Sequence, residues 1–432
     1  MNNALLSLYS GLWPLLFGAA KLFSPLHPRL RTFFSVREGS LATLEKNIAK
    51  VPSSQFRLWV HAASVGEFEQ ARPVIALLKE KHPDIALFVS FLSDSGYNAR
   101  KNFPDAAAVF YLPADTRSNA RKLLTLLKPD LLLLMRYDFW PNHLFEAKKR
   151  GVRLMLAAAV LQENSHYFNH LLKGFWQQIF HLFERIFTAS AKDTVAFREK
   201  FGCLQAETAG DPRFDQVVLR SRNSSKVDHL KPFYENRTAL CAGSVWQKDT
   251  ELILDAWLEQ EKRPALILVP HEVKPEQLQQ LYEALQQRSI PSVPVSAIDA
   301  SFDAGCQVLV IDQIGYLAEL YSIASFAYVG GGFGVNVHNT LEPAVYGIPV
   351  IFGPRHHNSP EAEGLAEAGG ATVVHDRESL TSILRFLTTD TAGRERIGRI
   401  AGKFVTERTG ATAIIAGSIE QMLAEAKKCI FA

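Results

Sequence analysis

Cysteine is scarce in this chain, and its four cysteines lie far apart, at Cys203, Cys241, Cys306 and Cys429. No pair has the Cys-x-x-Cys spacing of a thiolate zinc site, and scattered thiols do not indicate a disulfide framework. A strong charge imbalance is also missing, because the formal net charge is only +3. This charge gives no reason to expect nucleic-acid binding. A reducing, cytosol-facing location fits these absences best.

No segment combines the low hydrophobicity and high net charge that are typical of disorder. Hydrophobic residues make up 47% of the chain and charged residues 21%, which is a globular composition. The chain has 432 residues, too many for one ordinary hydrophobic core and enough for two domains.

The most apolar run lies at the N-terminus, where residues 4–20 read ALLSLYSGLWPLLFGAA without a charge. A membrane-spanning helix needs about 20 apolar residues, with about 17 as the lower limit. Basic residues follow the run, and no A-x-A-like cleavage site precedes them. We expect residues 1–31 to form a membrane anchor that spans the bilayer or lies in its interface, with the remainder cytoplasmic. A core helix is the alternative.

Short apolar runs alternate with helical patterns beyond residue 55. Runs such as FRLWVHAA, IALFVSFL and DLLLLMRYDF are typical of strands buried on both faces. After a polar interval near residues 216–235, the pattern starts again with TALCAGSV and PALILVPHE. The repetition predicts an α/β protein with two doubly wound, Rossmann-like domains. We place them at residues 32–217 and 218–432, with the last helix able to pack back onto the first domain.

Ligands of doubly wound sheets bind at the carboxyl ends of the strands. In the second domain, this rule points to the segment YVGGGFGVNVHNTLEPA, residues 328–344. Its glycines would let backbone amides approach a phosphate, and Glu342 would accept hydrogen bonds from ribose hydroxyls at a helix start. The alternative is a plain glycine turn followed by an acid that suits the helix dipole.

The glycine-rich segment matches neither the dinucleotide fingerprint nor the Walker loop, so a hydride-transfer or kinase activity is not favoured. No Asp-x-Asp pair or other metal-ligand cluster is visible. We therefore predict a nucleotide-sugar site without a metal. Its candidate donor-binding residues are Gly243, Ser244, His271, Gly315, Gly331, Gly332, Asn339 and Glu342.

In the first domain, the stretch HAASVGEFEQ carries a glutamate where a strand gives way to a helix. Ser64, Gly66 and Glu67 would lie at the carboxyl end of that strand. The apolar stripe of the helix includes Phe68 and Ala71 and leaves Glu67 outside. We expect this carboxylate to be ionised, because a helix N-terminus favours negative charge, and to act as a base. A glutamate that only caps the helix is the alternative.

Several of these motifs together resemble one family. SVGE, WPN, GDPRFD, AGS, HNTLEPA and FGP occur here in the order and spacing of the 3-deoxy-D-manno-octulosonic acid (Kdo) transferases, which act in lipopolysaccharide synthesis. The resemblance runs from the N-terminal apolar helix to near the C-terminus. It implies the GT-B fold of glycosyltransferase family 30, CMP-Kdo as donor, a lipid A precursor as acceptor, and inverting transfer without a metal or other cofactor at the inner membrane. It also implies that Glu67 is the catalytic base and that Glu342, with Asn339 beside it, binds the ribose.

The chain also departs from the family pattern. Where the family commonly has ETELWPN, this chain has RYDFWPN, so Arg136 stands in place of the first acid and Asp138 in place of the second. A family asparagine and arginine are replaced by Ala158 and Val160, and GEL has become GYL at Tyr316. These departures indicate a divergent branch whose acceptor contacts differ more than its reaction.

Four further residues are candidates for contacts with the acceptor or the sugar carboxylate: Ser64, Gly66, Asp138 and Arg213. For Arg213, a salt bridge to Asp211 or Asp215 is an equally good interpretation. The second-domain motifs alone would also permit another GT-B transferase that uses a uridine nucleotide sugar.

Overall fold

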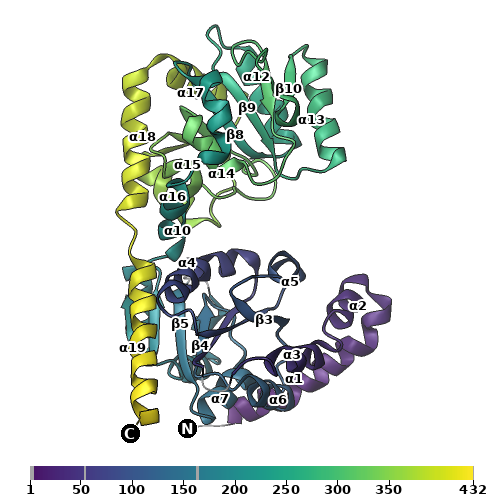
Figure 1. Ribbon diagram of the computed structural model, residues 1–432, viewed down its shortest axis with the longest axis vertical. Coiled ribbons are helices and arrows are strands. Elements are labelled where there is room, and N and C mark those ends of the chain that lie inside the picture. The colour runs from purple at the N-terminus through teal and green to yellow at the C-terminus, as the bar shows by residue number, and fades with distance from the viewer. Residues whose placement is uncertain (1–3, 53–54, 162–164, 432) are drawn as a thin grey trace. The chain divides into compact units, whose positions relative to one another are not determined.

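The chain folds into two compact units. The computed structural model describes residues 4–52, 55–161 and 165–431. The first unit comprises Met1–Gln216 and Thr409–Ala432, and the second comprises Val217–Arg408. The boundary after Gln216 lies next to the one expected at residue 217. The last helix, α19 (Ala411–Phe431), belongs to the first unit and is the yellow helix beside the blue elements in Figure 1.

A parallel seven-stranded sheet forms the centre of the first unit, with the order β3-β2-β1-β4-β5-β6-β7. Every residue of the neighbouring strands β2, β1 and β4 is buried, because apolar side chains pack on both faces. This explains their continuous rather than alternating apolar sequence. The strands are β1 (Arg57–Ala62), β2 (Ala86–Phe91), β3 (Ala106–Tyr111), β4 (Leu131–Met135), β5 (Arg153–Ala159), β6 (Arg185–Thr188) and β7 (Ala206–Thr208). The helices are α3 (Ser40–Ile48), α4 (Val65–Lys81), α5 (Asp94–Arg100), α6 (Arg117–Leu127), α7 (Pro141–Lys149), α8 (Lys173–Phe180) and α9 (Ala191–Phe201).

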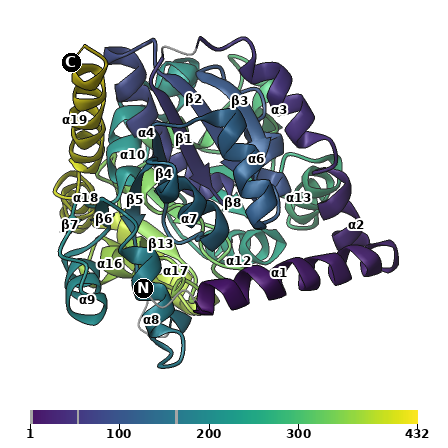
Figure 2. The ribbon, with the colours of Figure 1, turned by 90° about the horizontal axis from the view of Figure 1, so that it is seen from below.

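Helix α19 packs against α4 on one face of this sheet (Figures 1 and 2). Its side chains Ile415, Ile419 and Met422 are buried in the same apolar cluster as Phe68 of α4. The Asp215 carboxylate accepts hydrogen bonds from the backbone amides of residues 410 and 412, at 2.6 and 2.8 Å, and so caps the helix start. The C-terminal helix is therefore part of the first unit's core.

The second unit contains another parallel seven-stranded sheet, with the order β10-β11-β9-β8-β12-β13-β14. The predicted pair of doubly wound sheets is confirmed. The strands are β8 (Ala239–Val245), β9 (Ala265–Pro270), β10 (Ser292–Pro294), β11 (Val308–Val310), β12 (Phe326–Val329), β13 (Val350–Phe352) and β14 (Ala371–Val373). The helices are α10 (Pro212–Ser221), which begins in the first unit, α11 (Lys231–Tyr234), α12 (Gln247–Leu258), α13 (Pro275–Gln287), α14 (Leu317–Leu320), α15 (Leu341–Ala344), α16 (Pro360–Glu367), α17 (Arg377–Thr389) and α18 (Thr391–Thr406).

Near the middle of each sheet the strand order reverses, between β1 and β4 in the first unit and between β8 and β12 in the second. Loops that leave neighbouring strands at such a point run in opposite directions, and ligands bind in the crevice between them. The sequence ASVGE follows β1, and the glycines of the glycine-rich segment follow β12. Both predicted sites therefore lie where this fold binds ligands.

The N-terminal helix α1 (Ala4–Phe23) is exposed, so the core-helix alternative is wrong. The segment Leu5–Leu26 has a mean hydropathy of 1.3 and is long and apolar enough to cross a membrane. Side chains on one face of α1 contact the first unit: Tyr9 Oη donates to Asp115 at 2.9 Å, and Ser10 Oγ donates to Asn142 at 2.6 Å. Its opposite face exposes leucines 5, 8, 12, 15, 16 and 22. In Figures 1 and 2, α1 leads to the short helix α2 (Pro28–Ser35).

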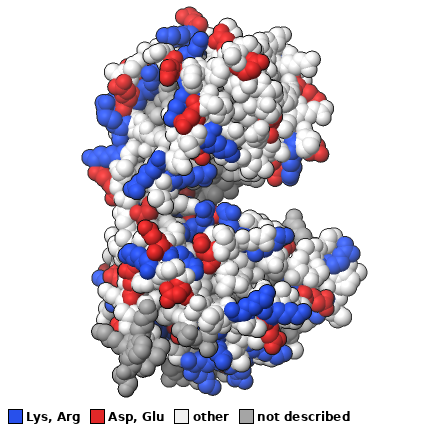
Figure 3. Space-filling view, in the orientation of Figure 1, with Lys and Arg blue, Asp and Glu red and all other residues white. Residues whose placement is uncertain are grey.

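Charged side chains of both signs are dispersed over the visible surface of each unit, without a single-sign face in this view (Figure 3). This agrees with the small net charge of +3. Three residues other than glycine have a positive φ at or beside strand ends: Arg136 (61°), Ala158 (51°) and Ser244 (53°). Such strain is commonly found where a fold positions functional groups.

Candidate functional site

In the first unit, Glu67 lies in the first turn of α4, as predicted. The helix begins after Ser64, whose extended φ of −138° makes it the N-cap residue. We predicted that Glu67 lies outside the buried apolar stripe of this helix. Glu67 is nevertheless buried, since it is only 6% exposed. Its Oε2 accepts a hydrogen bond from the Ala63 backbone amide. The capping contact is therefore present, while Oε1 makes no hydrogen bond within the described part of the chain.

We expected the surroundings of Glu67 to favour its ionised form, but burial disfavours that form. Loss of solvation disfavours the carboxylate form and raises the pKa above its usual value of 4.5. The Ala63 hydrogen bond opposes this rise, the negative charge of Asp138 adds to it, and the positive charge of Arg136 opposes it. We expected the helix N-terminus to dominate and favour ionisation, but desolvation is the larger effect. A carboxylate with a raised pKa is better suited to take a proton near neutral pH.

Asp138, in the loop after β4, is held near Glu67 by a chain of hydrogen bonds to side chains of β1 and β2. Its Oδ2 lies 2.9 Å from His61 Nε2, and His61 Nδ1 lies 2.8 Å from Ser90 Oγ. Trp59 Nε1–H donates to the same Ser90 oxygen at 2.8 Å. Because the indole only donates, the Ser90 hydroxyl can donate to His61 Nδ1, which leaves the His61 proton on Nε2, facing Asp138. Sequence reasoning identified Asp138 but missed His61 and Ser90.

Gly66, directly before Glu67, is exposed. A side chain there would meet only Ser64 Oγ, at 3.9 Å. Arg213 is placed differently: its Nε and Nη2 donate to Asp211 Oδ2 at 2.9 and 2.7 Å. The salt bridge of Arg213 to Asp211 is therefore present, and the Asp215 carboxylate accepts hydrogen bonds at the start of α19.

In the second unit, a cavity of about 300 Å³ brings together Ser244, Gly315, Asn339 and Glu342. Ser244 is near the end of β8, Gly315 precedes α14 with a φ of 88°, and Glu342 lies in the first turn of α15. The two helices have only four residues each, so their dipoles are small. Arg220 also lines the cavity, with Nη1 at 3.4 Å from Glu342 Oε1, and was missed from sequence.

The predicted role of the glycines needs a correction at Gly331. Its amide does not face a ligand, because it donates to the Asp249 carboxylate at 2.9 Å. Gly243, Gly331 and Gly332 are all buried and serve close packing. A side chain at Gly243 would lie 2.2 Å from Tyr321 Oη, and one at Gly332 would lie 2.5 Å from the Gly353 backbone nitrogen. These glycines allow chain segments behind the cavity to approach one another.

Asp249 organises this region and was not singled out from sequence. It is 1% exposed and accepts hydrogen bonds from Gly331 N at 2.9 Å, Tyr328 Oη at 2.8 Å and Trp246 N at 3.0 Å. Its carboxylate thus joins the start of α12 to the end of β12. An acid in the first turn of an apolar helix, in the sequence WQKDTELIL, is the signal that could have identified it.

Asp249→Ala is expected to lower the free energy of unfolding by about 2–3 kcal/mol, because it leaves buried donors without an acceptor. Asp255→Ala is the matched control on the same helix, since it removes only a partly exposed ion pair with Arg288, worth at most about 1 kcal/mol. Urea unfolding of both variants measures the difference. Equal losses would show that the buried network does not stabilise the glycine segment.

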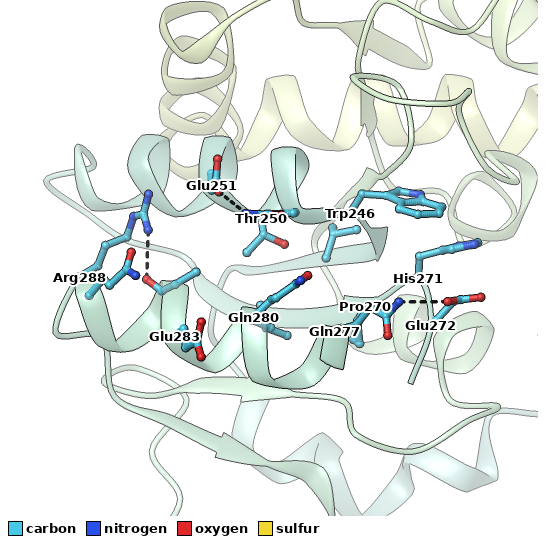
Figure 4. Close-up of a pocket in the computed structure, with 15 residues that line it drawn as sticks. Trp246, Thr250, Glu251, Pro270, His271, Glu272, Gln277, Gln280, Glu283 and Arg288 are labelled. Carbon is cyan, nitrogen blue, oxygen red and sulfur yellow. Dashed lines mark hydrogen bonds between the residues drawn. The ribbon is translucent and has the colours of Figure 1, made fainter. Parts of the chain in front are cut away.

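His338 lines the 300 Å³ cavity, and its ring packs with two further rings, those of Trp246 and His271. The ring centroids of Trp246 and His271 are 4.3 Å apart, and those of His271 and His338 are 4.4 Å apart. Figure 4 shows Trp246 and His271 facing each other at one end of a second cavity, of about 450 Å³, between α12 and α13. His271, predicted as a donor-binding residue, therefore lines this second cavity, and partial desolvation of its ring lowers its pKa below 6.5. Trp246 and His338 were part of quoted motifs without being singled out.

Residues 35–216 match the family model of 3-deoxy-D-manno-octulosonic-acid transferases (kdotransferases). A 3-deoxy-D-manno-octulosonic acid transferase of Haemophilus influenzae is 26% identical over 411 residues, which are 92% of this chain and 93% of that protein. One from Rickettsia felis is 27% identical over 365 residues, covering 83% and 77%. This chain is a glycosyltransferase related to the Kdo transferases.

Among solved structures, the UDP-GlcNAc 2-epimerase of Neisseria meningitidis bound to UDP-GlcNAc has a TM-score of 0.58 at 15% identity, covering 85% of this transferase and all of that chain. A glycosyltransferase of Rickettsia africae has a TM-score of 0.55 at 11% identity, covering 85% and 98%. At such identities these structures show the fold alone, and they confirm the predicted GT-B architecture of the transferase.

Proposed function

We propose that this transferase moves Kdo from CMP-Kdo to the sugar hydroxyl of a lipid A precursor, by inverting transfer without a metal. The observation that carries this proposal is Glu67: it is a buried carboxylate with a raised pKa, in an SVGE turn inside the region that matches the kdotransferase model. The two relatives that align with most of the chain are named 3-deoxy-D-manno-octulosonic acid transferases, which also supports the proposal.

In the proposed reaction, Glu67 removes the proton from the acceptor hydroxyl. The resulting oxygen attacks the anomeric carbon of Kdo from the face opposite the leaving group, and the bond from that carbon to the phosphate oxygen of CMP breaks. Oε1 of Glu67 is the oxygen without a hydrogen bond in the described residues and would receive the proton. Asp138, held through His61, keeps negative charge close to Glu67, which strengthens it as a base.

The second unit would hold the donor. The Glu342 carboxylate accepts hydrogen bonds from the ribose hydroxyls, and Asn339 holds the start of α15 through a 3.1 Å hydrogen bond from the Leu341 amide to its Oδ1. Ser244, strained at the end of β8, offers its hydroxyl to the phosphate. Fixed donors of this kind stabilise the charge that develops on a leaving group.

Competition between nucleotides tests the donor assignment. We expect CMP to bind the full-length protein at least about tenfold more tightly than UDP, measured by isothermal titration calorimetry in the presence of a chelator. Tighter binding of UDP would overturn the CMP donor and favour a transferase that uses a uridine nucleotide sugar. Loss of CMP binding on chelation would overturn the metal-free part of the proposal.

We also propose that α1 lies in the interface of the inner membrane on its cytoplasmic side, rather than spanning it. Tyr9 and Ser10 hold one face of the helix against the first unit, and Trp13 packs near Trp140 with ring centroids 6.0 Å apart. A spanning helix would have to release these contacts. The opposite, leucine-rich face would then contact the acyl chains of the membrane. The lipid acceptor resides in the same membrane.

Replacing Leu8, Leu12 and Leu15 together by glutamine is expected to weaken membrane binding by at least about 100-fold, since each leucine contributes about 1.5–3 kcal/mol when fully buried in an apolar phase. Flotation with vesicles that contain anionic lipid measures the binding. Leu204→Gln is the control, because Leu204 is a leucine of the first unit that is 82% exposed. Unchanged flotation of the triple variant would contradict the placement of α1.

A further inference from the structure

The Trp246 and His338 rings form a coplanar pair at the edge of the donor cavity. Trp246 Nε1 lies 3.1 Å from His338 Nε2, the two ring planes differ by 8°, and their centroids are 6.5 Å apart. They therefore lie side by side with the hydrogen bond in their common plane. The His271 ring stacks on both, at interplanar angles of 22° to Trp246 and 18° to His338. Two side chains from different segments, Trp246 and His271, thus hold the His338 imidazole in position.

The hydrogen bond determines which His338 nitrogen carries the proton. An indole N–H only donates, so His338 Nε2 must accept and carries no proton. The neutral imidazole then has its proton on Nδ1. Burial, with a smaller effect of the His271 charge, lowers the pKa of His338 to about 4, so the ring is neutral at physiological pH. The result is a neutral donor whose direction is fixed.

The Nδ1 atom of His338 has no hydrogen-bond partner in the described part of the fold. The Cδ2 edge faces the glycine segment, because a side chain at Gly331 would lie 3.2 Å from it. Nδ1 is on the opposite edge of the ring and makes no hydrogen bond within the described residues, and it is not among their buried, unpartnered polar atoms. His338 lines the same cavity as Ser244, Asn339 and Glu342.

We infer that His338 binds the phosphate of the sugar nucleotide through Nδ1–H, and that Trp246 fixes this tautomer by donating to Nε2. The ligand's identity rests on the proposed function, but the tautomer rests on the geometry alone. Trp246 is a positioning residue here, because it acts through His338. A neutral donor of fixed direction suits a phosphate that must leave at every turnover, since it binds the oxygen without forming a full ion pair.

The tautomer is tested by nitrogen NMR of the full-length protein labelled with 15N-histidine. We expect the His338 signals, assigned by their loss in His338→Asn, to show a protonated Nδ1 and a non-protonated Nε2. Trp246→Phe, which keeps an aromatic ring but removes the donor, should produce a mixture of tautomers. A protonated Nε2 in the wild type would overturn the inference, whatever the enzyme's substrate.

Two substitutions of His338 test its contact with the phosphate. The amide nitrogen of asparagine can take the place of Nδ1, whereas that of glutamine lies near the position of Nε2. We expect His338→Asn to bind CMP within about threefold of wild type and His338→Gln to bind about 10- to 100-fold more weakly, the range for a hydrogen bond to a charged group. His375→Asn, at an exposed histidine of the second unit, should match the wild type.

Cytidine, which lacks the phosphate, separates the phosphate contact from other effects. Its affinity should be the same in the asparagine and glutamine variants if His338 contacts the phosphate. Equal CMP affinity in both variants, or a matching loss for cytidine, would overturn the inference. Thermal unfolding confirms that each variant is folded. If CMP shows this pattern but Kdo is not transferred, the phosphate contact stands and the proposed reaction fails.

Discussion

Glu67→Gln is expected to lower kcat by about 100- to 10,000-fold, which is the usual contribution of a general base. The side-chain carbonyl oxygen of the introduced glutamine can still accept the hydrogen bond from the Ala63 amide, so α4 keeps its start. Only the capacity to take a proton is lost. Affinity for CMP should be unchanged, because Glu67 belongs to the first unit and the donor cavity to the second. Turnover near that of the wild type would remove Glu67 from the mechanism.

The same variant should be at least as stable as the wild type at neutral pH. The pKa of Glu67 is raised in the folded state above its usual 4.5, so folded protein binds this proton more tightly than unfolded protein does. The penalty for ionising Glu67 therefore develops as pH rises from the unfolded pKa through the folded pKa, and remains above it. Glutamine removes the penalty. Urea unfolding should show the stability difference at pH 7 and its disappearance below the usual pKa of 4.5; a less stable variant at neutral pH would contradict burial as the dominant effect.

Arg136 offers a test of the electrostatics around the base. Its positive charge lowers the pKa of Glu67, in opposition to desolvation. Arg136→Gln should therefore move the acidic limb of the kcat/KM profile to higher pH, because Glu67 stays protonated over a wider range. Tyr137→Phe, at the neighbouring exposed position, is the control and should leave the profile unchanged. A shift to lower pH in Arg136→Gln would show that this arginine does not act on Glu67.

Glu342→Ala is expected to weaken CMP binding by about 100-fold or more. Its carboxylate would make two charge-assisted hydrogen bonds to the ribose, each worth about 1.5–3 kcal/mol. The protein should remain folded, since the ion pair with Arg220 is at the surface, at 3.4 Å, and such pairs contribute at most about 1 kcal/mol.

The control for Glu342 is Glu367→Ala, an exposed glutamate at the end of α16 in the same unit. Calorimetric titration with CMP and with 2′,3′-dideoxy-CMP measures the contribution of the ribose hydroxyls. The dideoxy compound should bind wild type and Glu342→Ala equally weakly. If the alanine variant lost affinity for both compounds to the same extent, Glu342 would act on the shape of the cavity rather than on the ribose.

The fold could be predicted well from sequence because it depends on regular physical patterns. Strands buried on both faces must be continuously apolar, and β1, β2 and β4 are buried at every position. Glu67 and Glu342 could also be selected as candidate site residues from sequence, because each follows a predicted parallel strand. Loops that follow such strands lie at the ligand-binding edge of the sheet.

Burial and pairing of single polar groups could not be predicted in the same way. The carboxylate of Glu67 is buried by packing from distant segments, and helical periodicity does not report that. Gly331 donates to Asp249, a residue 82 positions away, and Arg213 pairs with Asp211. Each outcome depends on contacts between segments that the local sequence does not specify.

The coplanar Trp246–His338 pair shows the same limit. Its hydrogen bond joins residues 92 positions apart, and no sequence pattern pairs the tryptophan with the histidine of the HNTLEPA motif. Only the strand order, which places β8 beside β12, brings them together. The fold class therefore followed from periodicity, whereas the composition of the donor cavity required the three-dimensional structure.

The most direct test of the proposed function is transfer itself. Membranes that contain the full-length protein would be incubated with CMP-Kdo, a lipid A precursor and a chelator, and the lipid analysed by mass spectrometry. We predict that the lipid gains the mass of one or more Kdo residues, and that membranes with Glu67→Gln give no such product. Unmodified lipid in the presence of folded protein and intact CMP-Kdo would contradict the proposed reaction.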